Sequence, residues 1–214
     1  MAANLQGGAT LHNLHGKGFT LRALANHGVE VVQGDLNNAE SLKQALTGVW
    51  GVYAVQNTWE AGVEDTVRSL GFASTVILRP VFFMENLLSP WFLNGDKLVS
   101  AMALETRLQM IAVEDIGTFG ALAFTRAVEL NGRELDLAGD SVTLPEAAAT
   151  IGRELGRPLE YLQIPSSEVR KNSEDFALML EWFDRTGYDA DIAGLEQEFG
   201  VKMLSLEAWA RKQA

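Results

Sequence analysis

The sequence predicts an α/β protein in which a parallel sheet is flanked by helices and followed by a small, mainly helical C-terminal cap. Short runs rich in β-branched and aliphatic residues alternate with stretches whose apolar residues have helical spacing, the pattern of βαβ units. The clearest of these runs are Val29–Gln33, Val49–Val55 and Thr75–Leu78. Beyond residue 90 the pattern becomes mainly helical. We therefore expect residues 1–90 to form the main part of the sheet, and residues 91–214 to form its edge and the cap.

Composition limits the possible functions. The 214 residues suffice for one large domain, and 47% hydrophobic and 21% charged residues are ordinary for a globular protein. With 17 basic and 28 acidic residues, the net charge of −11 repels phosphate backbones and argues against direct nucleic-acid binding. The absence of cysteine excludes disulfides and thiolate sites and fits a reducing compartment. No run of 18 apolar residues suggests a membrane span, so we expect a cytoplasmic protein.

The first ninety residues should contain three helices and up to four strands. We expect a helix over Gly7–His15, another that begins at Asn37 or Asn38, and a third over Val63–Leu70. Only four residues separate the candidate strand Phe19–Leu24 from Val29–Gln33. A parallel crossover needs about a dozen residues, so these two strands should be antiparallel neighbours unless one lies outside the sheet.

Thr75–Leu78 has the composition of a strand buried on both faces of a parallel sheet, and Arg79-Pro80 should stop it. Phe82, Phe83 and Met84 follow its carboxyl end, where open α/β sheets bind their ligands. Composition alone allows these side chains to form either a pocket wall or a cap over the core. We expect Glu85 to pair with Arg79 or to cap a helix rather than to act as a general acid.

After residue 90, Lys97–Met102 and Leu108–Ala112 look like strands paired around a polar turn at Glu105-Thr106. Leu135–Leu137 should be a short strand. Thr143-Leu-Pro-Glu146 has the side-chain cap and early proline that open a helix. The further helices that we predict are Asp115–Glu129, Glu174–Arg185, Ile192–Phe199 and Leu206–Lys212.

The segment LRPVFFMENLL, Leu78–Leu88, closely resembles the strand-to-loop segment of NmrA-like proteins, an atypical branch of the short-chain dehydrogenase/reductase superfamily. Other segments agree with that family in the same order: Gly28–Leu46, Gly48–Glu60, Ile111–Ala121 and the tail SLEAWARK. The resemblance implies one continuous domain with a Rossmann-like, NAD(P)-binding sheet. Residues 1–90 would be its partial dinucleotide-binding portion, and residues 91–214 its sheet edge and the helical cap that binds substrate or partner.

The chain departs from the family in three places. Only the end of the family's GxxGxxG turn is present, at Leu5-Gln6-Gly7-Gly8, and the arginine that contacts the 2′-phosphate of NADP looks lost, since Arg22 resembles an earlier one. No tyrosine is followed four residues later by lysine, so the superfamily's YxxxK pair is missing. We therefore expect a sheet that is incomplete at its N-terminal, nucleotide-binding half, with internal deletions near residues 4–5, 24–25 and 63–65. A divergent relative that rebuilt these regions is the alternative.

The resemblance also implies site residues. Those carried over as cofactor-binding are Gly7, Arg22, Asp35, Leu36, Val55, Gln56, Asn57, Pro80, Val81, Phe82 and Phe83, and those for a substrate pocket are Phe83, Met84 and Asn86. Asp35 could instead simply support a turn, and Asn57 could cap a helical turn. We expect no metal site, because His12 and His15, although three residues apart, have no carboxylate or cysteine nearby.

Three functions remain open. In the first, the chain binds NADP or NAD and acts as a redox-sensing regulator of a protein partner, with little or no turnover. In the second, it is an NAD(P)H-dependent oxidoreductase acting on a quinone or a similar carbonyl compound, with the hydride supplied by the cofactor. In the third, the deletions have abolished cofactor binding and left a scaffold.

Overall fold

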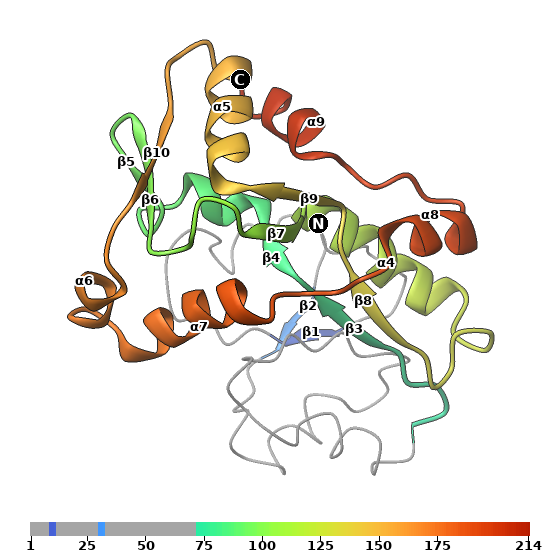
Figure 1. Cartoon of the computed structure of the whole chain (residues 1–214). Coiled ribbons are helices and arrows are strands. Elements are labelled where there is room, and N and C mark those ends of the chain that lie inside the picture. Colours follow the sequence, from blue (N-terminus) through green and yellow to red (C-terminus); the bar gives the residue numbers. More distant parts are fainter. Residues whose placement is uncertain (1–8, 12–29, 33–71) are drawn as a thin grey trace. The chain divides into compact units, whose positions relative to one another are not determined.

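The computed structural model describes residues 9–11, 30–32 and 72–214. The chain divides into two compact units, Met1–Leu70 and Gly71–Ala214, and each is described by itself. Figure 1 labels the elements in chain order.

In the first unit, strand β1 (Ala9–Leu11) pairs in parallel with strand β2 (Glu30–Val32), with Thr10 opposite Val31. The strand expected over Val29–Gln33 is confirmed for its described residues, Glu30–Val32. The helix expected over Gly7–His15 is wrong at its centre, because Ala9–Leu11 is extended and joins β2. A helical spacing of leucines is a local signal, and a distant strand that offers ladder hydrogen bonds overrides it. The elements expected over residues 19–24, 37–46, 49–55 and 63–70 lie outside the described residues.

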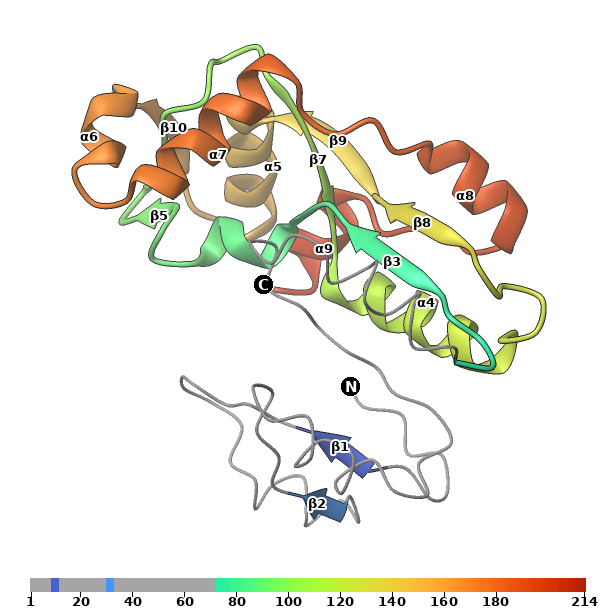
Figure 2. The same ribbon diagram turned by 90° about the horizontal axis from the view of Figure 1, so that it is seen from below.

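The second unit begins with strand β3 (Ile77–Pro80), which pairs in parallel with β8 (Glu134–Leu137). Figure 2 shows the two strands side by side. Two expectations for β3 were wrong, since the strand extends through Pro80 and its four residues are only half-buried. Proline is tolerated here because the amides that donate to β8 are those of alternate residues: Ile77 donates to the Arg133 carbonyl at 3.0 Å and Val81 to the Leu137 carbonyl at 3.1 Å. The nitrogen of Pro80 faces away from β8, so no hydrogen bond to that strand is lost.

Strand β7 (Arg107–Ile111) connects the next group of strands. It pairs in parallel with the short β4 (Phe82–Phe83) and antiparallel with β9 (Asp140–Thr143). A 3-10 helix, η1 (Met84–Leu88), follows β4 directly. The carboxyl ends of β4 and β7 therefore lie next to each other, with Phe83 opposite Ile111.

The third group contains β6 (Lys97–Ser100) between β5 (Leu93–Asn94) and β10 (Glu160–Gln163). The expectation that Lys97–Met102 pairs with Leu108–Ala112 was wrong, although both strands exist. β6 instead pairs in parallel with β10 and antiparallel with β5. Buried Leu98 and Ser100 alternate with half-buried neighbours on β6, and this pattern fixes the face of a strand but not its partner.

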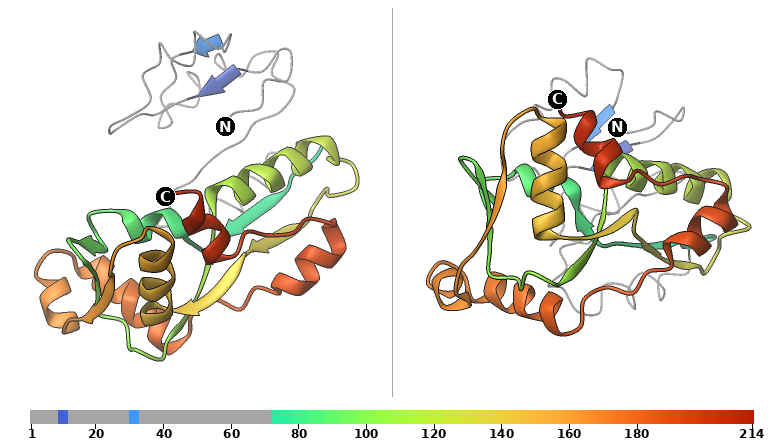
Figure 3. Two further views of the ribbon diagram at one scale, coloured as in Figure 1. Left: turned by 90° about the horizontal axis from the view of Figure 1, so that it is seen from above. Right: turned by 45° about the horizontal axis from the view of Figure 1, so that its top comes forward.

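The helices of this unit are α4 (Val113–Thr125), α5 (Leu144–Glu154), α6 (Ser166–Arg170), α7 (Glu174–Arg185), α8 (Ile192–Phe199) and α9 (Leu206–Arg211). The bounds expected for α7 and α8 are confirmed. Compared with the predicted helix Asp115–Glu129, α4 begins two residues earlier and ends four residues earlier. α5 and α9 lie side by side (Figures 1 and 3). Within the described ranges, no helix has the length and apolar content needed to cross a membrane.

Two apolar clusters form the core of the second unit. In one, the rings of Phe82 and Phe92 lie 5.2 Å apart, and this cluster extends to Trp209 of α9. In the other, Phe119 of α4 and Phe199 of α8 are 5.1 Å apart, and they pack with residues of β7 and β8. Neighbouring residues contribute to different clusters here: Val81 belongs to the second cluster, and Phe82, the first residue of β4, belongs to the first.

Candidate functional site

The predicted site residues at Pro80–Asn86 lie at the end of β3, in β4 and in η1. Phe82 is buried, and its ring contacts those of Phe92 at 5.2 Å and Phe183 at 6.1 Å. Met84 is completely buried, and Val81 is 4% exposed. Phe83 and Asn86 are half-buried. Composition had allowed either a cap over the core or a pocket wall. Phe82 and Met84 form a cap over the core, while Phe83 and Asn86 keep part of their surface accessible.

Glu85 connects this loop to two other elements. Its Oε1 accepts a hydrogen bond from the backbone N–H of Val113, the first residue of α4, at 3.1 Å. The same oxygen accepts from Nε1 of Trp209 in α9 at 3.0 Å. The expected helix-capping role is confirmed, and a carboxylate at a helix N-terminus is also favoured by the helix dipole. Arg79, the other partner considered for Glu85, pairs with Glu134 at 2.7 Å.

The second carboxylate oxygen of Glu85 differs from the first. Oε2 is buried and has no hydrogen-bond partner in the part of the chain that the structure describes. A buried acceptor without a partner is costly, and sites of this kind often accept a donor from a water or a ligand. This oxygen could accept from a hydroxyl or an amide group.

Two aspartates near the end of β7 hold the segment before α9. Asp115 of α4 accepts from the Leu204 N–H at 2.9 Å, and Asp140 of β9 accepts from the Leu206 N–H at 2.8 Å. Burial raises the pKa of the Asp115 carboxyl above its ordinary value, and the Leu204 hydrogen bond opposes part of that rise. Sequence reasoning missed both residues, because their partners are 89 and 66 positions away.

The remaining predicted site residues lie outside the described residues. These are Gly7, Arg22, Asp35, Leu36, Val55, Gln56 and Asn57. Their assignment to a cofactor stays a prediction, as does that of Pro80–Asn86.

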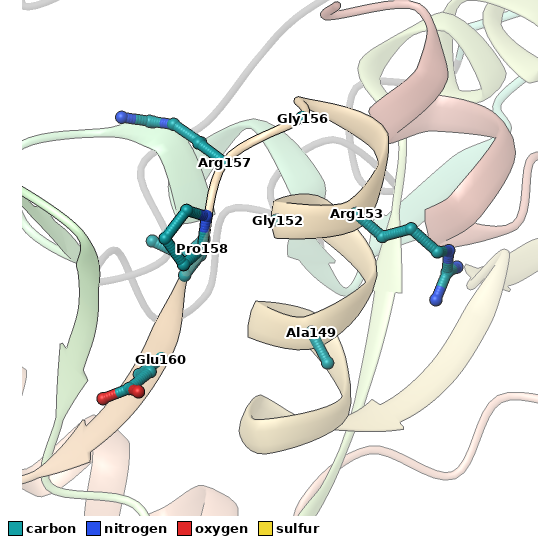
Figure 4. Close-up of a pocket in the computed structure, with 8 residues that line it drawn as sticks. Ala149, Gly152, Arg153, Gly156, Arg157, Pro158 and Glu160 are labelled. Atoms are coloured by element: carbon teal, nitrogen blue, oxygen red, sulfur yellow. The ribbon is translucent and has the colours of Figure 1, made fainter.

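Two hollows are present on the described surface of the second unit, away from Glu85. One, of about 450 Å³, lies between the end of α5 and the start of β10, where Arg153 and Arg157 point to opposite sides (Figure 4). The other, of about 360 Å³, is lined by Arg133 and by the acidic residues Glu134, Asp136, Asp189, Asp191 and Glu198. Its arginine is already paired with Glu198 at 2.8 Å. No group of three or more His, Cys, Asp or Glu residues within the described ranges could hold a metal ion.

A comparison with protein families identifies the chain. The model of the NmrA-like family matches residues 8–64 and 59–212, which together span nearly the whole sequence. The chain belongs to the NmrA-like family. The family resemblance of Leu78–Leu88 is thereby confirmed, and it extends over residues 8–212.

Solved structures support the Rossmann-type α/β fold of this NmrA-like chain. An NADPH-dependent quinone oxidoreductase from Escherichia coli, complexed with NADPH, has a TM-score of 0.71 at 16% identity, covering 90% of this chain and 86% of that one. A triphenylmethane reductase from Citrobacter sp., complexed with NADP(H), gives 0.65 at 16%, with coverage of 90% and 86%. NmrA, a negative transcriptional regulator, in complex with NAD gives 0.52 at 17%, with coverage of 89% and 66%.

The described end of β4 combines an aromatic surface with a polar acceptor. Half-buried Phe83 lies two positions before Glu85, whose buried Oε2 lacks a partner among the described residues. An apolar surface with a few polar groups is typical of small-molecule and cofactor sites. The assignment of Pro80–Phe83 to a cofactor nevertheless stays what the family resemblance implies.

Proposed function

We propose that this chain is a dinucleotide-binding redox sensor with little or no turnover, which binds NADP or NAD and reports the state of the cofactor to a protein partner. A structure of its relative NmrA, described as a negative transcriptional regulator, contains NAD. The net charge of −11 suits a partner with a basic surface. We place this function in the cytoplasm, in keeping with the cysteine-free sequence.

The proposal rests on the role that Glu85 has in the structure. The one carboxylate of the Pro80–Asn86 loop accepts two hydrogen bonds that fasten α4 and α9, which is a structural task. The described phenols are equally unsuited to proton transfer near neutral pH, because a general acid works best with a pKa near the working pH. Burial raises the pKa of Tyr161 to about 12, and burial also raises that of Tyr188.

A quinone reductase is the second candidate. Half-buried Phe83 could pack against a planar substrate, and one relative of similar fold is an NADPH-dependent quinone oxidoreductase. The cofactor would supply the hydride, and the protein would orient the two reactants and exclude water.

The third candidate, a chain that has lost cofactor binding, has its own support. The match to the family model comes in two segments that overlap at residues 59–64, next to the deletion expected near residues 63–65. A deletion that removed several hydrogen bonds to the cofactor, each worth about 1.5–3 kcal/mol when charged groups are involved, would abolish measurable affinity.

Two measurements together test these candidates. Calorimetric titration with NAD⁺, NADH, NADP⁺ and NADPH measures binding, and the absorbance at 340 nm in the presence of a quinone measures NADPH oxidation. A redox sensor binds the oxidised and reduced forms with different affinities and oxidises NADPH no faster than buffer. Saturable NADPH oxidation would overturn the sensor in favour of the reductase, and the absence of binding heat for all four nucleotides would favour the third candidate.

A pair of asparagine variants tests the predicted contact between Asn57 and the cofactor. Asn57→Ala should weaken binding about three- to tenfold, the loss expected for one neutral hydrogen bond. Asn94→Ala removes an exposed amide from β5 and serves as the matched control, with unchanged affinity. Equal affinities for the two variants would remove Asn57 from the site.

A further inference from the structure

We propose that Trp209 is a positioning residue for dinucleotide binding, and that it acts through Glu85 on the loop Pro80–Asn86. This inference rests on the proposed function, since it assumes that the loop contacts the cofactor. It assigns a binding role to a side chain in the last helix, which sequence reasoning connected with no site.

The residues around Trp209 form a C-terminal strap, Met203–Ala210, which is tied at three points. Asp115 accepts from the Leu204 N–H, Asp140 from the Leu206 N–H, and Glu85 from Trp209 Nε1. The three carboxylates come from α4, β9 and η1, elements that meet around the carboxyl ends of β4 and β7. The strap is therefore fixed to the strand ends that carry the candidate site.

Close packing reinforces these three hydrogen bonds. Met203, Leu206, Trp209 and Ala210 are all at most 4% exposed. At Gly139, between β8 and β9, an added Cβ would lie 2.9 Å from the carbonyl oxygen of Leu204 and 3.4 Å from the Cβ of Met203. The strap thus passes directly over a position where only glycine leaves room for it.

The hydrogen bond between Trp209 and Glu85 connects the strap to the loop Pro80–Asn86. Oε1 of Glu85 accepts hydrogen bonds from Trp209 Nε1 and from the Val113 N–H, while Oε2 is buried and has no partner among the described residues. The indole N–H is therefore one of two donors that hold this carboxylate. Without it, the side chain can turn towards water, and η1, which directly follows Phe82–Phe83, loses this hydrogen bond to α9. A loop that is not held in its binding conformation must be ordered by the ligand, which lowers affinity.

The affinity of the full-length chain for NADPH tests the role of the indole N–H. Trp209→Phe keeps a large aromatic ring but removes the donor, and it should weaken binding about tenfold, as expected for loss of a hydrogen bond to a charged group. Trp91→Phe is the matched control, because Trp91 is 67% exposed and its ring packs against Phe176 of α7, and it should bind as the wild type does.

Variants of Glu85 then show whether Trp209 acts through this carboxylate. Glu85→Gln retains an acceptor oxygen but loses the charge that strengthens the bond, so it should weaken binding less than Trp209→Phe does. Glu85→Leu loses the acceptor, and adding Trp209→Phe to it should weaken binding no further, because both changes remove the same bond. Full additivity of the two changes would overturn the proposal.

Hydrogen exchange of the wild-type chain provides a test that is independent of any variant's folding. Saturating NADPH should slow exchange of the Val113 amide and of the amides of residues 204–210, while those of α8 change little. Absence of NADPH binding to the wild type contradicts the proposed function itself. Tight NADPH binding with unchanged exchange in the strap, or with an unaffected Trp209→Phe variant, overturns this inference alone.

Discussion

Two helical glycines differ in the room that each leaves for a side chain. At Gly152, in α5, an added Cβ would lie 2.8 Å from the Arg157 carbonyl oxygen and 2.9 Å from the Leu159 nitrogen, both backbone atoms. At Gly117, in α4, nothing lies within 4 Å. Gly152→Ala should lower the free energy of unfolding by about 1–3 kcal/mol through overpacking. Gly117→Ala should raise it by about 0.5–1 kcal/mol, since alanine is the better helix former. Urea denaturation of both variants measures the difference, and equal effects would contradict the close contact at Gly152.

The Tyr161 hydroxyl provides a second prediction at this scale. It donates to the Met102 carbonyl oxygen at 2.6 Å, and burial raises its pKa to about 12. A raised tyrosine pKa means that its stabilising effect is complete below about pH 10 and is lost as the pH rises through about 12. In an absorbance titration at 295 nm, Tyr161→Phe should remove a late phenolate transition near pH 12. Loss of a transition near pH 10 instead would show that the hydroxyl is accessible to water.

Helix α5 begins with a capping box that can be tested as an element. The Thr143 side chain accepts from the Glu146 N–H at 3.3 Å, and Glu146 Oε2 accepts from the Thr143 N–H at 2.8 Å. Thr143→Ala should lower the free energy of unfolding by about 0.5–2 kcal/mol, whereas Thr143→Ser keeps the oxygen and most of the stability. Chemical denaturation at neutral pH compares the two, and equal losses would point to packing of the Thr143 methyl group instead.

The carboxylate of the capping box adds a dependence on pH. The Thr143 N–H lowers the pKa of Glu146 below its ordinary value, so the stabilisation is complete at neutral pH and is lost as the pH falls through that lowered pKa. Glu146→Gln should therefore lose part of this acid dependence. Parallel stability curves for the two proteins between pH 7 and pH 3 would contradict it.

At the level of elements, the sequence predicted local features better than long-range pairing. The bounds of α7 and α8 were predictable because the signals are adjacent, with Ser173 and Asp191 capping the first turns and Gly200 ending α8 at a positive φ of 66°. The pairing of β6 with β10 was not, because β10 lies some sixty residues away. β10 itself was missed, since three of its four residues are exposed and the strand lacks an apolar alternation.

For the candidate site, too, the sequence predicted the local segment but not its long-range contacts. The segment Leu78–Leu88 carried the family resemblance and led to Pro80–Asn86 directly. The roles of Glu85, Asp115 and Asp140 depend on donors that are 28 to 124 positions away, which no local pattern indicates. Burial of Phe82 and Met84 likewise depends on helices and strands that pack over them from the rest of the second unit.

For the whole molecule, the division into two units predicts the behaviour of a fragment. Gly71–Ala214 forms a compact unit of its own, and among the described residues both apolar clusters are built from it, between Val76 and Ala210. A fragment of residues 71–214 should therefore unfold cooperatively on heating and show near-ultraviolet circular dichroism from its buried aromatic residues. It should also fail to bind NADPH, because the residues predicted for most of the cofactor lie in Met1–Leu70. A fragment without a cooperative transition would show that the second unit needs the first in order to fold.

The burial of α9 also affects the timing of folding. Leu206, Trp209 and Ala210 belong to the same apolar cluster as Phe82, although more than 120 positions separate them from it in the sequence. The cluster cannot close while these residues are still inside the ribosomal exit tunnel. Folding of the second unit therefore finishes only after the chain has emerged through Ala210, and a product truncated before residue 206 would have an open core that cellular proteases can degrade.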